Sequence, residues 1–272
     1  MITWRLALAI VPAALLAQWP AYKNANSPRL PDGTVNLTAP APKAADGHPD
    51  LSGIWGGGML PGVHPGDAPV AVGAIPPAPS PVFRNLGVLF PDGIPLQPWA
   101  AELRKQRMAA HSKDHPDAHC LPLNPIQLHS HRQPRKIIQK PGLIVILYEA
   151  NDGIRQIFMD GRPLPNNDPD PWWYGYSIGH WEGDTLVVQT TAFQEPGWID
   201  EEGTPISDTG KLTERFRRLN YGTLQIEMTV DDPKTFTRAW SFNLNQALMP
   251  DTELIEFVCL ENNTSVKHLV GY

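Results

Sequence analysis

The residues of this chain that are best suited to proton transfer are His180, Glu214 and Glu256. A histidine changes its charge near neutral pH, and a carboxyl group that alternates with apolar strand residues can have a raised pKa, so both can act as acid or base. We therefore take these three as candidate catalytic residues. The competing interpretations are a structural histidine at position 180 and an ion pair between Glu214 and Arg215 or Arg217, because a buried carboxylate requires a partner.

A second group of side chains is suited to holding a small molecule. An arginine near a carboxylate, as in Asp160 and Arg162, can bind an anionic substrate through two hydrogen bonds, or the two residues can pair with each other in a turn. Large aromatic side chains line ligand pockets, although they also fill cores. The candidate ligand-binding residues are Trp55, Asp160, Arg162, Trp173, Tyr176, His180, Arg215, Trp240, Glu256 and His268.

Three histidines, His111, His115 and His119, recur every four residues. On a continuous helix they would share one face and could bind zinc or copper, so a divalent metal is the one cofactor that the sequence suggests. Pro116 interrupts that helix, and the alternative is a solvated polar loop. We expect no other cofactor, because the chain has no phosphate-binding loop, dinucleotide fingerprint, H-E-x-x-H or G-x-S-x-G motif.

The elements that must position these side chains are predominantly strands. Residues 177–193 predict a β-hairpin, since Gly183 and Asp184 favour a tight turn and strand formers flank it. Strict alternation of apolar and polar residues over 224–230 predicts a strand with one buried face. Further strand signals cover residues 136–139, 143–148, 154–159, 212–219, 236–244 and 253–260.

Joining these strands through short turns gives a mainly β fold, an antiparallel meander of about nine or ten strands. Closing the sheet into a lipocalin-like barrel removes its edges, and a barrel of this size can hold one small ligand in its mouth. A two-sheet sandwich is the alternative. The alternation of His180 and Glu214 with apolar residues of their strands predicts that both side chains face the interior of the barrel. Residues 98–111 predict one short helix that starts at a proline. No internal repeat is evident.

The N-terminal residues predict export from the cell. In residues 1–21, Arg5 precedes an apolar run that is too short to span a bilayer, as in a signal peptide, which predicts a periplasmic or secreted protein. Residues 22–48 are rich in proline and polar residues and predict a disordered leader. Residues 49–272 are expected to form a single barrel-like domain, with a long loop and the short helix between residues 56 and 135.

Export makes a disulfide chemically reasonable, and Cys120 and Cys259 either form one or remain separate thiols. Charged residues make up 18% of the chain, and the net charge is −6. No basic stripe is present, so nucleic acid is not an expected partner. No segment beyond the predicted signal is long and apolar enough to cross a membrane. The expected partner is a small-molecule ligand.

Seven motifs occur in order over most of residues 49–271. They are PDLSGIW (Pro49–Trp55), IFMDGRPLP (Ile157–Pro165), YGYSIGHWEGDTLVV (Tyr174–Val188), LTERFRR (Leu212–Arg218), VDDPKTFTRAW (Val230–Trp240), MPDTELIEFVCLENN (Met249–Asn263) and HLVG (His268–Gly271). In these motifs the chain resembles a large family of exported bacterial proteins that has no assigned catalytic residues. Gly53-Ile54-Trp55 is also similar to the Gly-x-Trp of the first strand of lipocalin-type barrels, which implies a barrel.

Three functions fit these features. The first, which the sequence favours, is the binding of a small, largely apolar molecule in the barrel mouth. The second is an acid–base enzyme, a lyase, isomerase or hydrolase, that uses histidine and carboxylates in the same pocket. The third is an interaction module without a pocket, which would expose an apolar patch.

Overall fold

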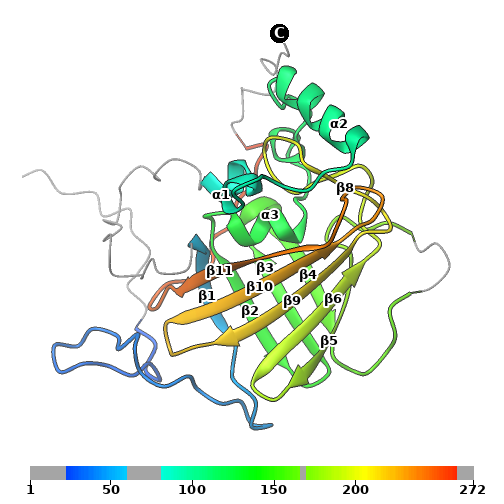
Figure 1. The fold of residues 1–272 in the computed structure, drawn as a ribbon. Coiled ribbons are helices and arrows are strands. Elements are labelled where there is room, and N and C mark those ends of the chain that lie inside the picture. Colours follow the sequence, from blue (N-terminus) through cyan, green and yellow to red (C-terminus); the bar gives the residue numbers. More distant parts are fainter. Residues whose placement is uncertain (1–22, 60–80, 166–169, 262–272) are drawn as a thin grey trace, which may run out of the picture.

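The protein folds around a closed β-barrel (Figure 1). The computed structural model describes residues 23–59, 81–165 and 170–261. Within these residues nine strands close the barrel in the order β1-β11-β10-β9-β6-β5-β4-β3-β2. The predicted mainly β barrel is therefore confirmed, and the two-sheet sandwich is excluded.

Four pairs of consecutive barrel strands are joined by short turns, at residues 141–142, 149–152, 183–184 and 219–222. The alternation predicted for residues 224–230 is observed, because Leu224, Ile226, Met228 and Val230 are all buried. The barrel strands are β1 (Gly53–Met59), β2 (Arg135–Lys140), β3 (Leu143–Tyr148), β4 (Gly153–Phe158), β5 (Tyr176–Glu182), β6 (Thr185–Thr191), β9 (Lys211–Arg218), β10 (Thr223–Asp231) and β11 (Trp240–Leu248), and a separate pair consists of β7 (Gly197–Trp198) and β8 (Pro205–Ile206).

One seam of the barrel is weaker than the others. β4 and β5 are parallel and pair only through Ile157 with Ser177 and Phe158 with Ile178, whereas the other neighbouring strands are antiparallel. A parallel pair requires a crossover connection, and residues 159–175 provide it. With so few ladder hydrogen bonds, this seam depends on side chains for its stability.

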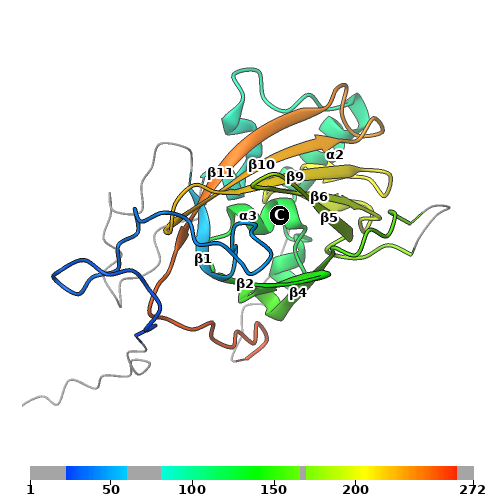
Figure 2. The same cartoon turned by 90° about the horizontal axis from the view of Figure 1, so that it is seen from below.

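A short helix fills one end of the barrel. α3 (Pro125–Ser130) begins with Pro125, and the side chain of Asn124 accepts a hydrogen bond from the backbone N–H of Ile126, which is a stable way to start a helix. All six residues of α3 are buried. Seen from below, the helix lies within the ring of strands (Figure 2).

Two further helices lie over the same end, α1 (Pro81–Arg84) and α2 (Pro98–Ala109), with 3-10 turns at Leu86–Leu89, Pro116–His119 and Ala150–Asp152. α2 confirms the helix predicted from residue 98. None of the helices in the described part of the chain is long and apolar enough to span a bilayer.

The prediction of a disordered leader is wrong for residues 23–48, which wind along the other end of the barrel (Figure 1). Two turns with the same hydrogen bonds follow each other. In the first, Leu30 N–H donates to Thr34 and Asn36 N–H to Pro28. In the second, fourteen residues later, Ala44 N–H donates to His48 and Asp50 N–H to Pro42. An internal repeat, residues 28–38 and 42–52, is therefore present.

Near the end of each copy of the repeat, a leucine attaches the segment to the barrel. Gly222, in the turn between β9 and β10, donates its N–H to the carbonyl of Leu37 over 2.8 Å. Leu51 is buried, and its carbonyl accepts a hydrogen bond of 3.0 Å from the indole of Trp55. Between them, His48 stacks on Trp181 at 4.6 Å. Short Asp-Gly turns and these anchors order a sequence whose composition resembles a disordered segment.

The strand predicted at residues 253–260 is also wrong. Residues 252–258 lie at the surface and form no strand. The reason is that β1 already pairs with the free side of β11, so the closed barrel offers no edge to a further strand. Cys259 instead forms a disulfide with Cys120, across 139 residues of chain.

We predict that the double variant Cys120→Ser/Cys259→Ser has a lower free energy of unfolding by roughly 2–5 kcal/mol, because a bridge that closes a long loop restricts the unfolded chain. Urea unfolding at neutral pH measures the change. Reductant should destabilise the native protein by a similar amount and leave the double variant unaffected. Equal unfolding midpoints for the native protein with and without reductant would contradict the prediction.

Candidate functional site

The predicted inward orientation of Glu214 is observed, but its partners are other than predicted. Glu214, on β9, is fully buried and forms an ion pair with Arg155 of β4, in which both carboxylate oxygens accept hydrogen bonds from the guanidinium. Nε2 of His129, on α3, lies 2.6 Å from Oε1 of Glu214. The ion pairs expected with Arg215 or Arg217 do not form. We call Arg155, Glu214 and His129 the interior charge cluster.

The interior charge cluster also closes the weak seam between β4 and β5. Nε of Arg155 donates to the hydroxyl of Ser177 on β5 over 3.2 Å, and Nη2 donates to the hydroxyl of Thr190 on β6 over 2.9 Å. The two hydroxyl oxygens lie 3.0 Å apart. One guanidinium thus holds three neighbouring strands and supplies the contacts that the short parallel ladder lacks.

Two further side chains fix the helix in the barrel through the backbone of His129. Gln246 of β11 donates to the carbonyl of His129 over 3.0 Å, and Arg135 of β2 donates to the same oxygen over 3.4 Å. Arg135 also donates to the carbonyl of His131 over 2.7 Å. These bonds satisfy carbonyls at the end of α3, which a buried helix end requires.

The electrostatics of the cluster follow from burial and pairing. Burial alone would raise the pKa of Glu214, but the attraction of Arg155 and hydrogen bonds from Arg155 and His129 outweigh it and lower the pKa to about 2. Burial lowers the pKa of His129, because its charged form loses solvation, against the opposing effect of Glu214. Arg155 and Glu214 therefore stay ionised and His129 neutral at neutral pH. All three side chains are buried and paired with one another, which is the arrangement of a structural ion cluster.

The predicted pocket in the barrel mouth does not form from the residues proposed for it. Trp55 and Trp240 are buried, at 0% and 3% exposure, and pack in the core. Trp240 contacts Phe90, Phe236 and Phe242. Together with α3 and the interior charge cluster, these side chains fill the space that the prediction left for a ligand.

The remaining predicted contacts lie on the outer surface. His180 is exposed and lies 3.3 Å from Glu182, which also pairs with Arg215 at 2.8 Å. The predicted interior orientation of His180 is therefore wrong.

Glu256 is exposed in the C-terminal segment, so it does not share a pocket with Glu214. His268 and the predicted signal peptide lie outside the described residues.

The turn interpretation holds for Asp160 and Arg162. The guanidinium of Arg162 donates to both carboxylate oxygens of Asp160, at 2.9 and 3.0 Å from Nε, and both side chains are exposed. The guanidinium is therefore already paired, which weakens its use as an anion receptor.

The histidine series does not lie on one helix face. α2 ends at Ala109, and His111 has a left-handed backbone with φ of 54°. His115 is buried, with Nε2 2.7 Å from the amide nitrogen of Gln127, and Nε2 of His119 lies 2.8 Å from the carbonyl of Lys113. In the described part of the chain, no three His, Cys, Asp or Glu side chains are grouped so that they could hold a metal ion.

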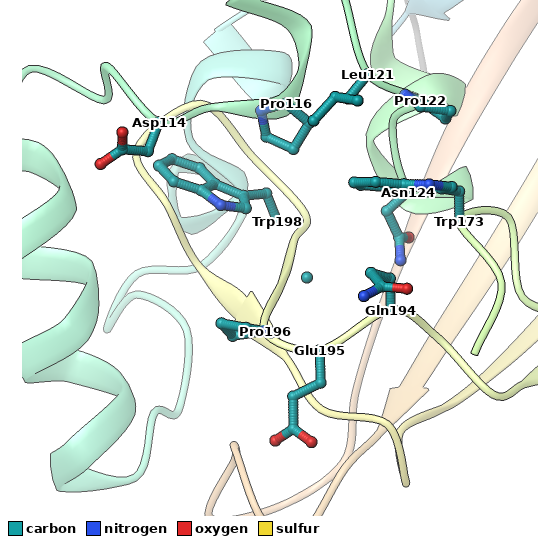
Figure 3. A pocket seen from close by; sticks show the side chains of 11 residues that line it. Asp114, Pro116, Leu121, Pro122, Asn124, Trp173, Gln194, Glu195, Pro196 and Trp198 are labelled. Atoms are coloured by element: carbon teal, nitrogen blue, oxygen red, sulfur yellow. The ribbon is translucent and has the colours of Figure 1, made fainter. Parts of the chain in front are cut away.

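A cleft of about 220 Å³ lies at the rim of the barrel, beside the buried helix (Figure 3). We call it the rim cleft. Trp173 and Trp198 lie on opposite sides of it, and Trp173 is 36% exposed. Of the residues that line it, sequence reasoning identified Trp173 alone. The lining residues are Asp114, Pro116, Leu121, Pro122, Asn124, Trp173, Gln194, Glu195, Pro196, Gly197 and Trp198.

One wall of the rim cleft is held rigidly. The guanidinium of Arg107, on α2, lies 4.1 Å over the ring of Trp198, and His115 meets the same ring edge-on at 5.1 Å. Arg107 also donates to the carbonyls of Pro196 and Gly197, over 3.1 and 3.2 Å. These contacts fix the indole before any ligand binds, which reduces the entropy cost of binding.

The polar groups of the rim cleft are mainly amides. The carboxamides of Asn124 and Gln194 are near the centre of the cleft, whereas the carboxylates of Asp114 and Glu195 point away from it (Figure 3). The oxygen of the Asn124 amide already accepts from Ile126, so its NH₂ group is the part available to a ligand. The cleft thus combines aromatic walls with uncharged hydrogen-bonding groups.

We predict that Glu214→Gln lowers the free energy of unfolding by about 3–5 kcal/mol, because it leaves the buried charge of Arg155 without its partner. The matched control is Glu182→Gln, which breaks an exposed ion pair with Arg215 and should leave the stability almost unchanged. Chemical denaturation of the three proteins makes the comparison. A similar decrease in the free energy of unfolding in both variants would contradict the prediction.

Stability should fall as the pH decreases from about 6.5 to 4. Burial lowers the pKa of His115 and of His131 from 6.5 to about 4, so the unfolded chain binds more protons in this window. Protonation of the unfolded chain in this window should therefore lower the free energy of unfolding by an amount on the order of a few kcal/mol. The carboxylate of Glu214, whose pKa is lowered, should lose its stabilising effect only below about pH 4.5.

Denaturation curves at pH 7, 5.5 and 4 measure this dependence. His115→Gln should flatten it, and the exposed control His180→Gln should not. A profile that is unchanged in His115→Gln would contradict the assignment.

Comparison of the chain with family models, with curated proteins and with solved structures finds no match. The resemblance to exported bacterial proteins therefore stays a prediction, and the geometry of the rim cleft is the basis for assigning a function.

Proposed function

We propose that this protein binds a small ring-shaped molecule in the rim cleft. The observation that carries the proposal is the placement of Trp173 and Trp198 on opposite sides of a cleft that also presents the amides of Asn124 and Gln194. Ligand sites combine apolar walls with a few well-placed polar groups. The proposed site is therefore the rim cleft and not the barrel mouth, because core side chains occupy the barrel mouth.

The cleft favours a neutral ligand with an apolar face and a polar edge. Indole rings stack on flat apolar faces, and carboxamides donate to and accept from hydroxyl or carbonyl groups. No Lys or Arg is among the residues that line the cleft, which disfavours an anion. Its volume of about 220 Å³ is below the usual range for drug-sized ligands, so a single ring is the expected occupant.

Binding is better supported than acid–base catalysis. The three residues proposed to carry catalysis lie apart, with Glu214 buried in the barrel and His180 and Glu256 exposed elsewhere. A proton-transfer site needs its acid and base within reach of one substrate. The disulfide between Cys120 and Cys259 is consistent with the proposal that the protein works outside the cytoplasm.

We predict millimolar or tighter binding of a hydroxylated ring, measured by saturation-transfer NMR with glucose, mannose, xylose and catechol as probes. Trp173→Ala should weaken the binding of the active probe about tenfold or more, because the stacking surface is lost. Gln194→Ala should weaken it several-fold.

The matched control is Trp99→Ala, since Trp99 is similarly exposed, at 45%, and lies on α2 away from the cleft lining. Absence of transfer to every probe, or equal effects of Trp99→Ala and Trp173→Ala, would refute the proposal.

A further inference from the structure

Aromatic side chains continue from the rim cleft along the outside of the barrel. Trp172, next to Trp173, is 44% exposed, and its ring lies 5.4 Å from that of Tyr176. Tyr176 lies 5.2 Å from Phe158, and the guanidinium of Arg162 covers Phe158 at 3.9 Å. We call Trp172, Tyr176 and Phe158 the aromatic row.

The backbone connects the aromatic row to the rim cleft. Trp172 donates its N–H to the carbonyl of Ala192 over 2.9 Å, and Gln194 donates its N–H to the carbonyl of Trp172 over 3.2 Å. Gln194 lines the cleft, so the first member of the row and a polar group of the cleft are held in one short ladder. The backbone of Trp172 is therefore held next to a residue that lines the rim cleft.

The polar atoms along the row alternate with its rings. The hydroxyl of Tyr176 accepts a hydrogen bond from Arg162 over 3.2 Å, and Arg162 in turn is paired with Asp160. The positive charge beside the row is thereby neutralised by an adjacent carboxylate. A surface of this kind offers apolar ring faces bordered by hydrogen-bonding groups, without a net charge that would select a polyanion.

A series of aromatic faces with polar borders fits a ligand that repeats the same pattern. The pyranose units of an oligosaccharide each have a face of C–H groups, which stacks on an aromatic ring, and an edge of hydroxyls, which bonds to amides, hydroxyls and carboxylates. A single ring fills the rim cleft, and further rings of the same chain would reach Trp172 and then Tyr176. Trp172 is 44% exposed, which is costly for so large an apolar side chain, whereas Tyr176 and Phe158 are half-buried.

We infer that the ligand of this protein is a neutral oligosaccharide, with one terminal ring in the rim cleft and the following rings on the aromatic row. The inference rests on the proposed function, because it extends the ligand of the rim cleft. It adds that affinity grows with chain length, and that Trp172 contributes to the binding of chains but not of single sugars.

Titration calorimetry of the purified full chain tests the inference. It compares the affinities for glucose, mannose and xylose with those for cellohexaose, mannohexaose and xylohexaose. We expect at least one hexasaccharide to bind about tenfold or more tightly than its monosaccharide. Trp172→Ala should weaken the hexasaccharide about tenfold and leave the monosaccharide unchanged. Trp173→Ala should weaken both, and the exposed control Trp99→Ala neither.

The possible failures are distinguishable. A hexasaccharide that binds no more tightly than its monosaccharide, or is unaffected by Trp172→Ala, overturns the inference and leaves the cleft proposal in place. Binding of catechol but of no saccharide does the same. Absence of binding of every probe overturns both.

Discussion

The contact on which this structure depends is the buried pair of Arg155 and Glu214. Each charge is tolerable inside the barrel only because the other lies against it, and removing one would leave an uncompensated ion in a water-free interior. Arg155 lies on β4 and Glu214 on β9, while His129 joins them from α3. Two strands and the helix must therefore be in place together, which couples closure of the barrel to insertion of the helix.

This arrangement explains why the candidate site lies at the rim and not in the barrel mouth. A helix and a set of ions occupy the space where small barrels hold their ligands. The connections at the same end of the barrel then form the cleft, since the segment leading into α3 supplies Asn124 and β7 supplies Trp198. Arg107 of α2 holds both the indole and the adjacent carbonyls. The candidate site thus consists of residues from connecting segments. These segments have no periodic sequence pattern, so strand periodicity does not predict the site.

The sequence was sufficient to predict the barrel, the α2 helix and the inward orientation of Glu214, because these follow from local alternation and turns. It did not predict the partner of Glu214, since Arg155 is on a strand 59 residues earlier and nothing in the spacing links them. The error for His180 has a different cause. In β5 the small residues Ser177 and Gly179 face inward, where a side chain on Gly179 would collide with Met159, so the larger residues of this strand face outward.

The same alternation, with small or charged residues inside and larger rings outside, produces the aromatic row. Side chains alternate along a strand, so the position of Arg155 and Ile157 inside the barrel requires that Phe158 lie outside. Likewise, Ser177 faces inward to receive a hydrogen bond from Arg155, which places Tyr176 on the outer surface. The pairing register of β4 and β5 therefore determines two features together. It places Arg155 inside the barrel, and it places the rings of Phe158 and Tyr176 on the outer side. A substitution that relieved the interior charge by shifting either strand would also disrupt the aromatic row.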